Sequence, residues 1–272
     1  MAVGKYIRAN GLDIFYREHG LGHPLVLLHG ATDTHKLWDK FIPELSKIFR
    51  VITPDTRGHG RTINPDGVLS YQQLADDLAA FIQALDLDKP FVFGYSDGGQ
   101  AALDLGLRYP DLTGGLILGG VWYRFSEEYQ SSLKVSGFMG PGEIDFQVFE
   151  KNAPADWKER MAKAHPHSDP NYPVFLLREL AVLFWTPLHY SASDFLRISA
   201  PTLILMGEKD EMVPPAEARE LADLIPGARI EIIPGATHSG VFDRGDLITR
   251  IVMDFFTHLM ERNSRNDLID PS

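Results

Sequence analysis

The stretch Gly94-Tyr95-Ser96-Asp97-Gly98-Gly99 decides how this chain folds. It lies between a short apolar run, Pro90-Phe91-Val92-Phe93, and a segment with helical spacing that begins near Gly98. A serine with glycines two positions away on either side is typical of a nucleophile elbow, a strained strand-to-helix turn. Because such a string also occurs by chance, the inference depends on the buried strand before it and the helix after it.

An alternation of strands and helices extends from this stretch in both directions. The apolar runs that predict buried strands are residues 25–28, 51–53, 90–93, 116–118, 201–207 and 229–233. The segments that predict helices are residues 71–87, 98–108, 215–224 and 246–260, and Trp38 to Leu45 also shows helical spacing. This order predicts an α/β protein with a mostly parallel central sheet and helices on both faces, preceded by an antiparallel hairpin that turns at Asn10-Gly11.

The alternation breaks between residues 122 and 197, where helical segments rich in aromatic residues predict an inserted helical cap. Residues 1–121 and 198–260 are therefore expected to form the core. The polar residues 261–272 are expected to form a flexible tail.

Composition narrows the classes of partner. The 272 residues carry a formal net charge of -11, which argues against nucleic acid or an anionic membrane as a partner. There is no cysteine, so disulfides, a thiol nucleophile and thiolate metal sites are excluded. No signal-peptide-like or membrane-spanning stretch is visible, and a cytoplasmic location is the default expectation.

A serine nucleophile needs a base and an acid that orients the base. His238 follows the predicted strand 229–233 in a loop of small residues, which makes it the best-placed base. Three carboxylates, Glu208, Asp210 and Glu211, follow the strand 201–207. Asp210 is the preferred acid, and the chain order Ser96, Asp210, His238 is that expected for a serine elbow of this kind.

These motifs together resemble the α/β-hydrolase superfamily, in its capped, serine esterase-like group. His29-Gly30-Ala31 is similar to the family's oxyanion loop, the residues 55–62 (DTRGHGRT) to its Asp-x-Arg-Gly turn, and the residues 207–214 (GEKDEMVP) to its acid loop. The resemblance covers nearly the full length and implies that the backbone N–H groups of Ala31 and Asp97 form an oxyanion hole. Dehalogenases and epoxide hydrolases of this fold use aspartate where this chain has Ser96, so they are excluded.

The expected function is therefore a cofactor-free serine hydrolase, carboxylesterase-like, that cleaves small, largely apolar carboxylic esters through an acyl-enzyme. Lactone hydrolysis, α-amino-acid ester hydrolysis and carbon–carbon bond hydrolysis would use the same three side chains. A non-catalytic small-molecule receptor is the alternative from a different class.

Asp97 departs from the commoner family pattern, and the Ser-Asp-Gly-Gly elbow is similar to that of the valacyclovir-hydrolase-like branch. In that branch the aspartate is associated with the amino group of α-amino-acid esters. The simpler interpretation is a carboxylate favoured by the helix N-terminus, and it is preferred here.

Aromatic residues of the cap are expected to influence substrate choice, because a cap closes over strand ends. Candidate substrate-binding residues are Phe138, Phe175, Phe184, Trp185 and Val213. The string His165-Pro166-His167-Ser168-Asp169 resembles part of a metal motif, but is interpreted as a solvated cap loop. Gly58-His59-Gly60 lacks the third glycine and the helix of a dinucleotide fingerprint.

Overall fold

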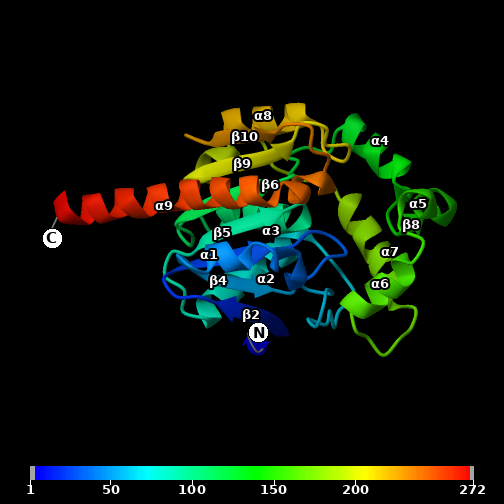
Figure 1. The fold of residues 1–272 in the computed structure, drawn as a ribbon. Helices are drawn as coiled ribbons and strands as arrows, with labels where there is room; N and C mark the ends of the chain where they lie inside the picture. Colours follow the sequence, from blue (N-terminus) through cyan, green and yellow to red (C-terminus); the bar gives the residue numbers. More distant parts are fainter. Residues whose placement is uncertain (1–3, 270–272) are drawn as a thin grey trace.

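A twisted eight-stranded sheet organises the computed structural model, which describes residues 4–269 (Figure 1). The strand order is β1-β2-β4-β3-β5-β6-β9-β10, and every pair from β4 to β10 is parallel. The strands are β1 (Lys5–Ala9), β2 (Leu12–His19), β3 (His23–Leu28), β4 (Phe49–Pro54), β5 (Phe91–Tyr95), β6 (Gly115–Gly119), β9 (Thr202–Gly207) and β10 (Arg229–Ile233). The prediction of an α/β protein with a mostly parallel sheet is confirmed.

The antiparallel part of the sheet is the predicted N-terminal hairpin. Asn10 and Gly11 both have positive φ, 45° and 75°, as a type I′ turn requires. This turn pairs Ala9 with Leu12, and β2 then continues antiparallel to β4.

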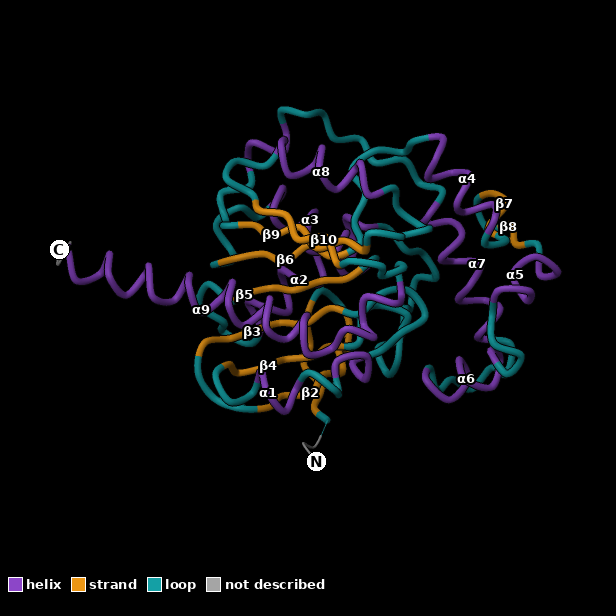
Figure 2. The backbone as a smooth tube through the Cα atoms, turned by 45° about the horizontal axis from the view of Figure 1, so that its top comes forward, coloured by secondary structure: helices purple, strands orange, loops and turns teal. Residues whose placement is uncertain are grey.

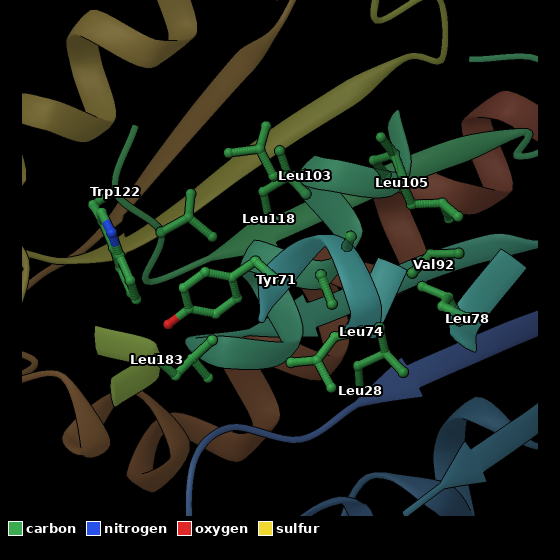
Figure 3. Packing of buried hydrophobic residues seen from close by; sticks show 14 of the residues in the cluster. Leu28, Tyr71, Leu74, Leu78, Val92, Leu103, Leu105, Leu118, Trp122 and Leu183 are labelled. Carbon is green, nitrogen blue, oxygen red and sulfur yellow. The ribbon is translucent and has the colours of Figure 1, made fainter. Parts of the chain in front are cut away.

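Helices cover both faces of the sheet, because successive side chains of each buried strand point to opposite sides. In β3, Val26 and Leu28 pack into one apolar cluster and Leu25 and Leu27 into the other. The first cluster includes α2 (Tyr71–Ala84), α3 (Asp97–Arg108) and α8 (Pro215–Leu224), and Figure 3 shows part of it. The second includes the short α1 (Ile42–Leu45) and α9 (Gly245–Ile269).

The cap gathers at one end of the sheet, and the C-terminal part of α9 extends beyond the opposite end (Figures 1 and 2). The elements of the cap are α4 (Glu127–Val135), β7 (Phe138–Gly140), β8 (Glu143–Ile144), α5 (Phe146–Asn152), α6 (Trp157–Ala164) and α7 (Tyr172–Phe184). The cap is thus helical apart from one small antiparallel hairpin, which the sequence did not predict.

Two further elements differ from expectation. The helical spacing around Trp38 to Leu45 belongs to two short pieces, the 3₁₀ turn η1 (His35–Trp38) and α1, not to one helix. The last helix was expected to end near Met260, but α9 continues to Ile269. No glycine or proline occurs between Gly245 and Pro271 to end it. Residues 261–269 are therefore helical, and 270–272 lie outside the described residues.

Candidate active site

Ser96 occupies the sharp turn between β5 and α3. Its φ of 54° and ψ of -119° are strained for a residue with a side chain, as expected of a nucleophile elbow. The glycines are needed because a Cβ on Gly94 would lie 2.0 Å from the Gly98 carbonyl oxygen, and one on Gly98 would lie 2.5 Å from that of Leu28. The Ser96 N–H donates to the Gly119 carbonyl at 2.7 Å, which ties the turn to the neighbouring strand β6.

Asp210 and His238 meet beyond the ends of β9 and β10. Asp210 Oδ2 and His238 Nδ1 are 2.8 Å apart, and the Asp210 side chain is fully buried. Asp210 Oδ1 accepts the backbone N–H groups of Met212 and Val213 at 3.0 and 2.9 Å. The carboxylate is thereby fixed, and it places the imidazole proton on Nδ1, which leaves Nε2 free to act as a base.

The two other carboxylates of the acid loop contact backbone and not the imidazole. Glu208 Oε2 accepts the Gly235 N–H at 2.7 Å, and Glu211 Oε2 accepts the His238 N–H at 3.0 Å. The Tyr95 hydroxyl donates to the His238 carbonyl at 2.6 Å. Asp210 is therefore the acid that touches the ring, while its neighbours hold the loop that carries it.

The imidazole of His238 lies beside the elbow. A Cβ on Gly120 would be 2.8 Å from His238 Cε1, and the preceding residue, Gly119, is the one that accepts the Ser96 N–H. Within residues 4–269 the Ser96 hydroxyl makes no hydrogen bond. Hydrogen bonds between nucleophile and base are often long in ligand-free enzymes.

The loop after β3 passes close to Ser96. A Cβ on Gly30 would lie 3.1 Å from the Ser96 Cβ and 3.3 Å from the Tyr95 carbonyl oxygen. Ala31 follows directly, and Asp97 is the first residue of α3, where N–H groups have no partner inside the helix. The backbone at Ala31 thus follows a residue that contacts the elbow, and Asp97 follows Ser96 directly. The oxyanion-hole role of their two N–H groups stays a prediction.

The Asp97 carboxylate is buried, with 4% of the residue exposed. Its Oδ1 accepts the Tyr71 hydroxyl at 2.9 Å, whereas Oδ2 is buried and has no hydrogen-bond partner within residues 4–269. Burial raises the pKa of Asp97 to about 7, against the opposing effects of the Tyr71 hydrogen bond and His238. The carboxylate does not bond the N–H groups of its own first helical turn, so the helix-cap interpretation lacks its hydrogen bond.

Three aromatic residues near Asp97 were not predicted from the sequence. The ring of Tyr71 meets that of Trp122 edge-on, with 5.5 Å between the ring centroids, and Trp122 stacks on Tyr129 with 4.5 Å between the centroids. Burial is the main cause of the raised pKa of both tyrosines, and the charge of Asp97 raises the pKa further. The available signal was the position of Trp122, three residues after β6 and so at the same sheet edge as Ser96.

The five substrate-binding candidates are scattered through the cap and the acid loop. The rings of Phe138 and Phe184 pack edge-on with 5.1 Å between their centroids, and Trp185 Nε1 donates to the Phe138 carbonyl at 3.1 Å. Phe175 is 43% exposed on α7, whereas Val213 is buried and donates to Asp210. Their role in substrate binding stays a prediction.

The interpretation of the His165–Asp169 string as a solvated loop is wrong for His165, which is 1% exposed. His167 is exposed, as expected, and accepts the Asp169 N–H at 3.1 Å. His165 is desolvated because the cap packs it against core loops more than a hundred residues away in sequence. Among residues 4–269 no group of three His, Asp or Glu side chains is placed to hold a metal ion.

Arg57 joins the polar turn after β4 to α2. Its guanidinium makes a bidentate contact with Asp77, at 2.7 and 2.8 Å, and both side chains are buried. A buried bidentate pair of this kind fixes the turn geometrically. Gly60 is required there, because a Cβ would lie 2.0 Å from Asp55 Oδ2.

The model of the alpha/beta hydrolase family matches residues 25–250, and the chain belongs to this family. The 2-hydroxy-6-oxo-6-(2'-aminophenyl)hexa-2,4-dienoic acid hydrolase of Metapseudomonas resinovorans is 26% identical, over 94% of this chain and 91% of that protein. A thermophilic esterase from Thermogutta terrifontis superposes with a TM-score of 0.71 at 25% identity, over 95% of this chain and 99% of the esterase. The enol-lactonase of Burkholderia xenovorans LB400 superposes with a TM-score of 0.70 at 25% identity, over 93% of this chain and 99% of the lactonase.

The predicted superfamily and fold are thereby confirmed, and the family and its named relatives support a hydrolase. No helix within residues 4–269 is both long and apolar enough to cross a lipid bilayer.

Proposed function

We propose that this chain is a serine hydrolase that cleaves small, largely apolar carboxylic esters through an acyl-enzyme on Ser96. The observation that carries the proposal is the 2.8 Å contact between Asp210 and His238, which fixes the imidazole beside a strained serine elbow. The similarity to an esterase and an enol-lactonase along nearly the whole chain supports the same chemistry.

The mechanism follows from these positions. His238 Nε2 takes the proton of the Ser96 hydroxyl as Oγ attacks the ester carbonyl carbon, and the negative oxygen forms beside the N–H groups of Ala31 and Asp97. The imidazolium then gives its proton to the leaving alcohol, and an acyl-enzyme remains. Water activated by His238 attacks this ester and releases the acid, with Asp210 stabilising the imidazolium throughout.

Labelling with a fluorophosphonate tests the nucleophile directly. The wild-type protein should be labelled, and Ser96→Ala and His238→Ala should lose the label. Ser199→Ala and His258→Ala, which change exposed residues of the same types, serve as controls and should be labelled normally. An unlabelled wild type would favour a non-catalytic receptor on the same fold. A parallel screen of p-nitrophenyl esters, lactones and vinylogous diketones separates ester, lactone and carbon–carbon bond hydrolysis.

A second candidate, hydrolysis of α-amino-acid esters, is favoured by the unpartnered Oδ2 of Asp97. A substrate ammonium group would supply the missing hydrogen bond and lower the pKa of this buried carboxyl. The test compares kcat/KM for an α-amino ester and its des-amino analogue. A preference for the amino ester that disappears in Asp97→Asn supports this candidate, and equal values in the wild type reject it.

The cap aromatics remain the proposed source of acyl or aryl selectivity. The mutual packing of Phe138 and Phe184 supports an apolar cap interior, in keeping with apolar esters and not with sugars or polyanions.

A further inference from the structure

A buried histidine joins the cap to two loops of the core. His165, at the C-terminal end of α6, accepts the Gly60 N–H through Nδ1 at 2.8 Å and donates through Nε2 to the Thr32 carbonyl at 2.9 Å. Because the Gly60 N–H can only donate and the Thr32 carbonyl can only accept, the ring is neutral with its proton on Nε2. One cap side chain therefore fixes two backbone groups that lie on different loops.

Thr32 is the strained residue of the loop that passes Ser96. Its φ of 59° is unusual for a β-branched residue, and such a conformation persists only where the surroundings enforce it. Its N–H donates to His59 Nε2 at 3.3 Å, and its carbonyl accepts from His165. Imidazoles thus hold both backbone polar groups of the residue that directly follows Ala31.

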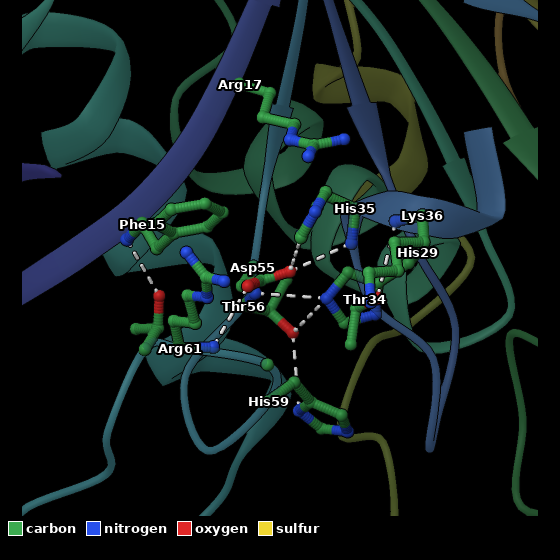
Figure 4. Close-up of polar contacts among 12 residues, drawn as sticks. Phe15, Arg17, His29, Thr34, His35, Lys36, Asp55, Thr56, His59 and Arg61 are labelled. Atoms are coloured by element: carbon green, nitrogen blue, oxygen red, sulfur yellow. Dashed lines mark hydrogen bonds and ion pairs between the residues drawn. The ribbon is translucent and has the colours of Figure 1, made fainter. Parts of the chain in front are cut away.

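His59 is the middle ring of a series of three. Its centroid lies 5.2 Å from that of His29 and 5.5 Å from that of His165. His29 Nε2 accepts the Thr56 N–H at 3.1 Å, so each of the three rings is used as a neutral acceptor (Figure 4 shows the part around His29 and His59). Burial lowers the pKa of all three, partly offset by Asp55.

We propose that His165 is a positioning residue for the oxyanion hole. Its hydrogen bond to Thr32 holds the strained backbone that aims the Ala31 N–H, so the cap must be seated on the core for the site to be complete. The inference rests on the proposed function for its catalytic consequence, but the loop contact itself can be tested separately.

Two variants test the two hydrogen bonds of His165 separately. In His165→Asn the amide oxygen can replace Nδ1 as acceptor for Gly60, whereas the contact with Thr32 is lost. In His165→Gln the longer amide can replace Nε2 as donor to Thr32. His167→Asn and His167→Gln are matched controls, because His167 lies in the same cap loop but is exposed.

The catalytic arm measures hydrolysis of a p-nitrophenyl ester. His165→Asn should lower kcat by about 10- to 100-fold with little change in KM, because the Ala31 N–H meets a charge that develops only in the transition state. His165→Gln should stay within a few-fold of wild type. Equal losses in both variants, or none in either beyond the His167 controls, would overturn the proposal.

The structural arm does not need activity. Measured well below the Tm of each variant, amide hydrogen exchange of peptides that cover residues 30–34 should become faster in His165→Asn and remain near wild type in His165→Gln, relative to peptides elsewhere in the same variant. Unchanged exchange in His165→Asn rejects the role of His165 in holding the loop, even if the wild type proves inactive. Faster exchange without a loss of kcat in an active enzyme rejects the catalytic consequence alone.

Discussion

The core loops and the cap build the candidate site by different means. Around Ser96, backbone packs on backbone so closely that a single added Cβ on Gly98 would overlap two carbonyl groups. The cap, besides its apolar packing, reaches the core through side-chain hydrogen bonds such as His165 to Thr32 and the Tyr172 hydroxyl to the Gly58 carbonyl at 2.6 Å. Substitutions in the core loops should therefore cause large losses of kcat or of folding stability. Substitutions at the cap contacts should change the same quantities by smaller amounts.

The largest effect is expected within the acid loop. Asp210→Asn should lower kcat by about 10³- to 10⁴-fold, because an amide at this position no longer holds the imidazole in the tautomer required of the base. Glu211→Gln, which leaves the ring contact in place, should lose less than about tenfold. Steady-state hydrolysis of one ester by both variants checks the comparison. Similar losses would show that the loop backbone, and not the Asp210–His238 contact, limits the rate.

The second-largest effect is expected where the serine elbow packs closely on neighbouring backbone. Gly98→Ala should lower the free energy of unfolding by about 3 to 5 kcal/mol, because the new Cβ meets the carbonyls of Leu28 and His29 at 2.5 and 2.6 Å. Gly142→Ala in the cap, where the nearest atom is 3.6 Å away, should cost only about 1 kcal/mol for its positive φ. Urea unfolding of both variants measures the difference, and equal costs would contradict it.

The buried carboxylate of Asp97 gives a pH-dependent effect. In the folded protein its pKa is about 7, above the ordinary value of 3.8, so at pH 8 folding buries a charge. Asp97→Asn should raise the free energy of unfolding by about 2 to 3 kcal/mol at pH 8. The gain should disappear as the pH falls from 7 to 4, where the wild-type carboxyl is protonated. Asp13→Asn on the exposed hairpin is the control, and a gain independent of pH would contradict the prediction.

The smallest effect concerns His165 in acid. Burial lowers the pKa of His165 in the folded protein, so the unfolded chain takes up a proton first as the pH falls below about 6.5. His59, His29 and Asp55 are titratable groups near it. The stability advantage of wild type over His165→Gln should therefore narrow between pH 7.5 and 5, measured by urea unfolding with His167→Gln alongside. A widening difference would contradict the assignment of a neutral ring.

The sequence by itself determined the sheet and predicted a serine elbow with Ser96, Asp210 and His238 at strand ends. These follow from local patterns, since apolar runs end at polar loops and the carboxyl ends of parallel strands share one edge. It preferred Asp210 over Glu208 and Glu211 as the acid, but which carboxylate contacts His238 depends on how the loop folds, because neighbouring residues of one loop point in different directions.

Only the tertiary structure decided what surrounds these residues. The sequence of residues 165–169 is polar and indicates a solvated loop, yet packing of the cap on the core buries His165 and leaves His167 exposed. Likewise, Asp97 is buried and bonds Tyr71 of α2, 26 positions away, while its Oδ2 has no hydrogen-bond partner in the part of the chain that the structure describes. Burial and hydrogen bonding depend on segments that are distant in sequence, and local pattern carries no record of them.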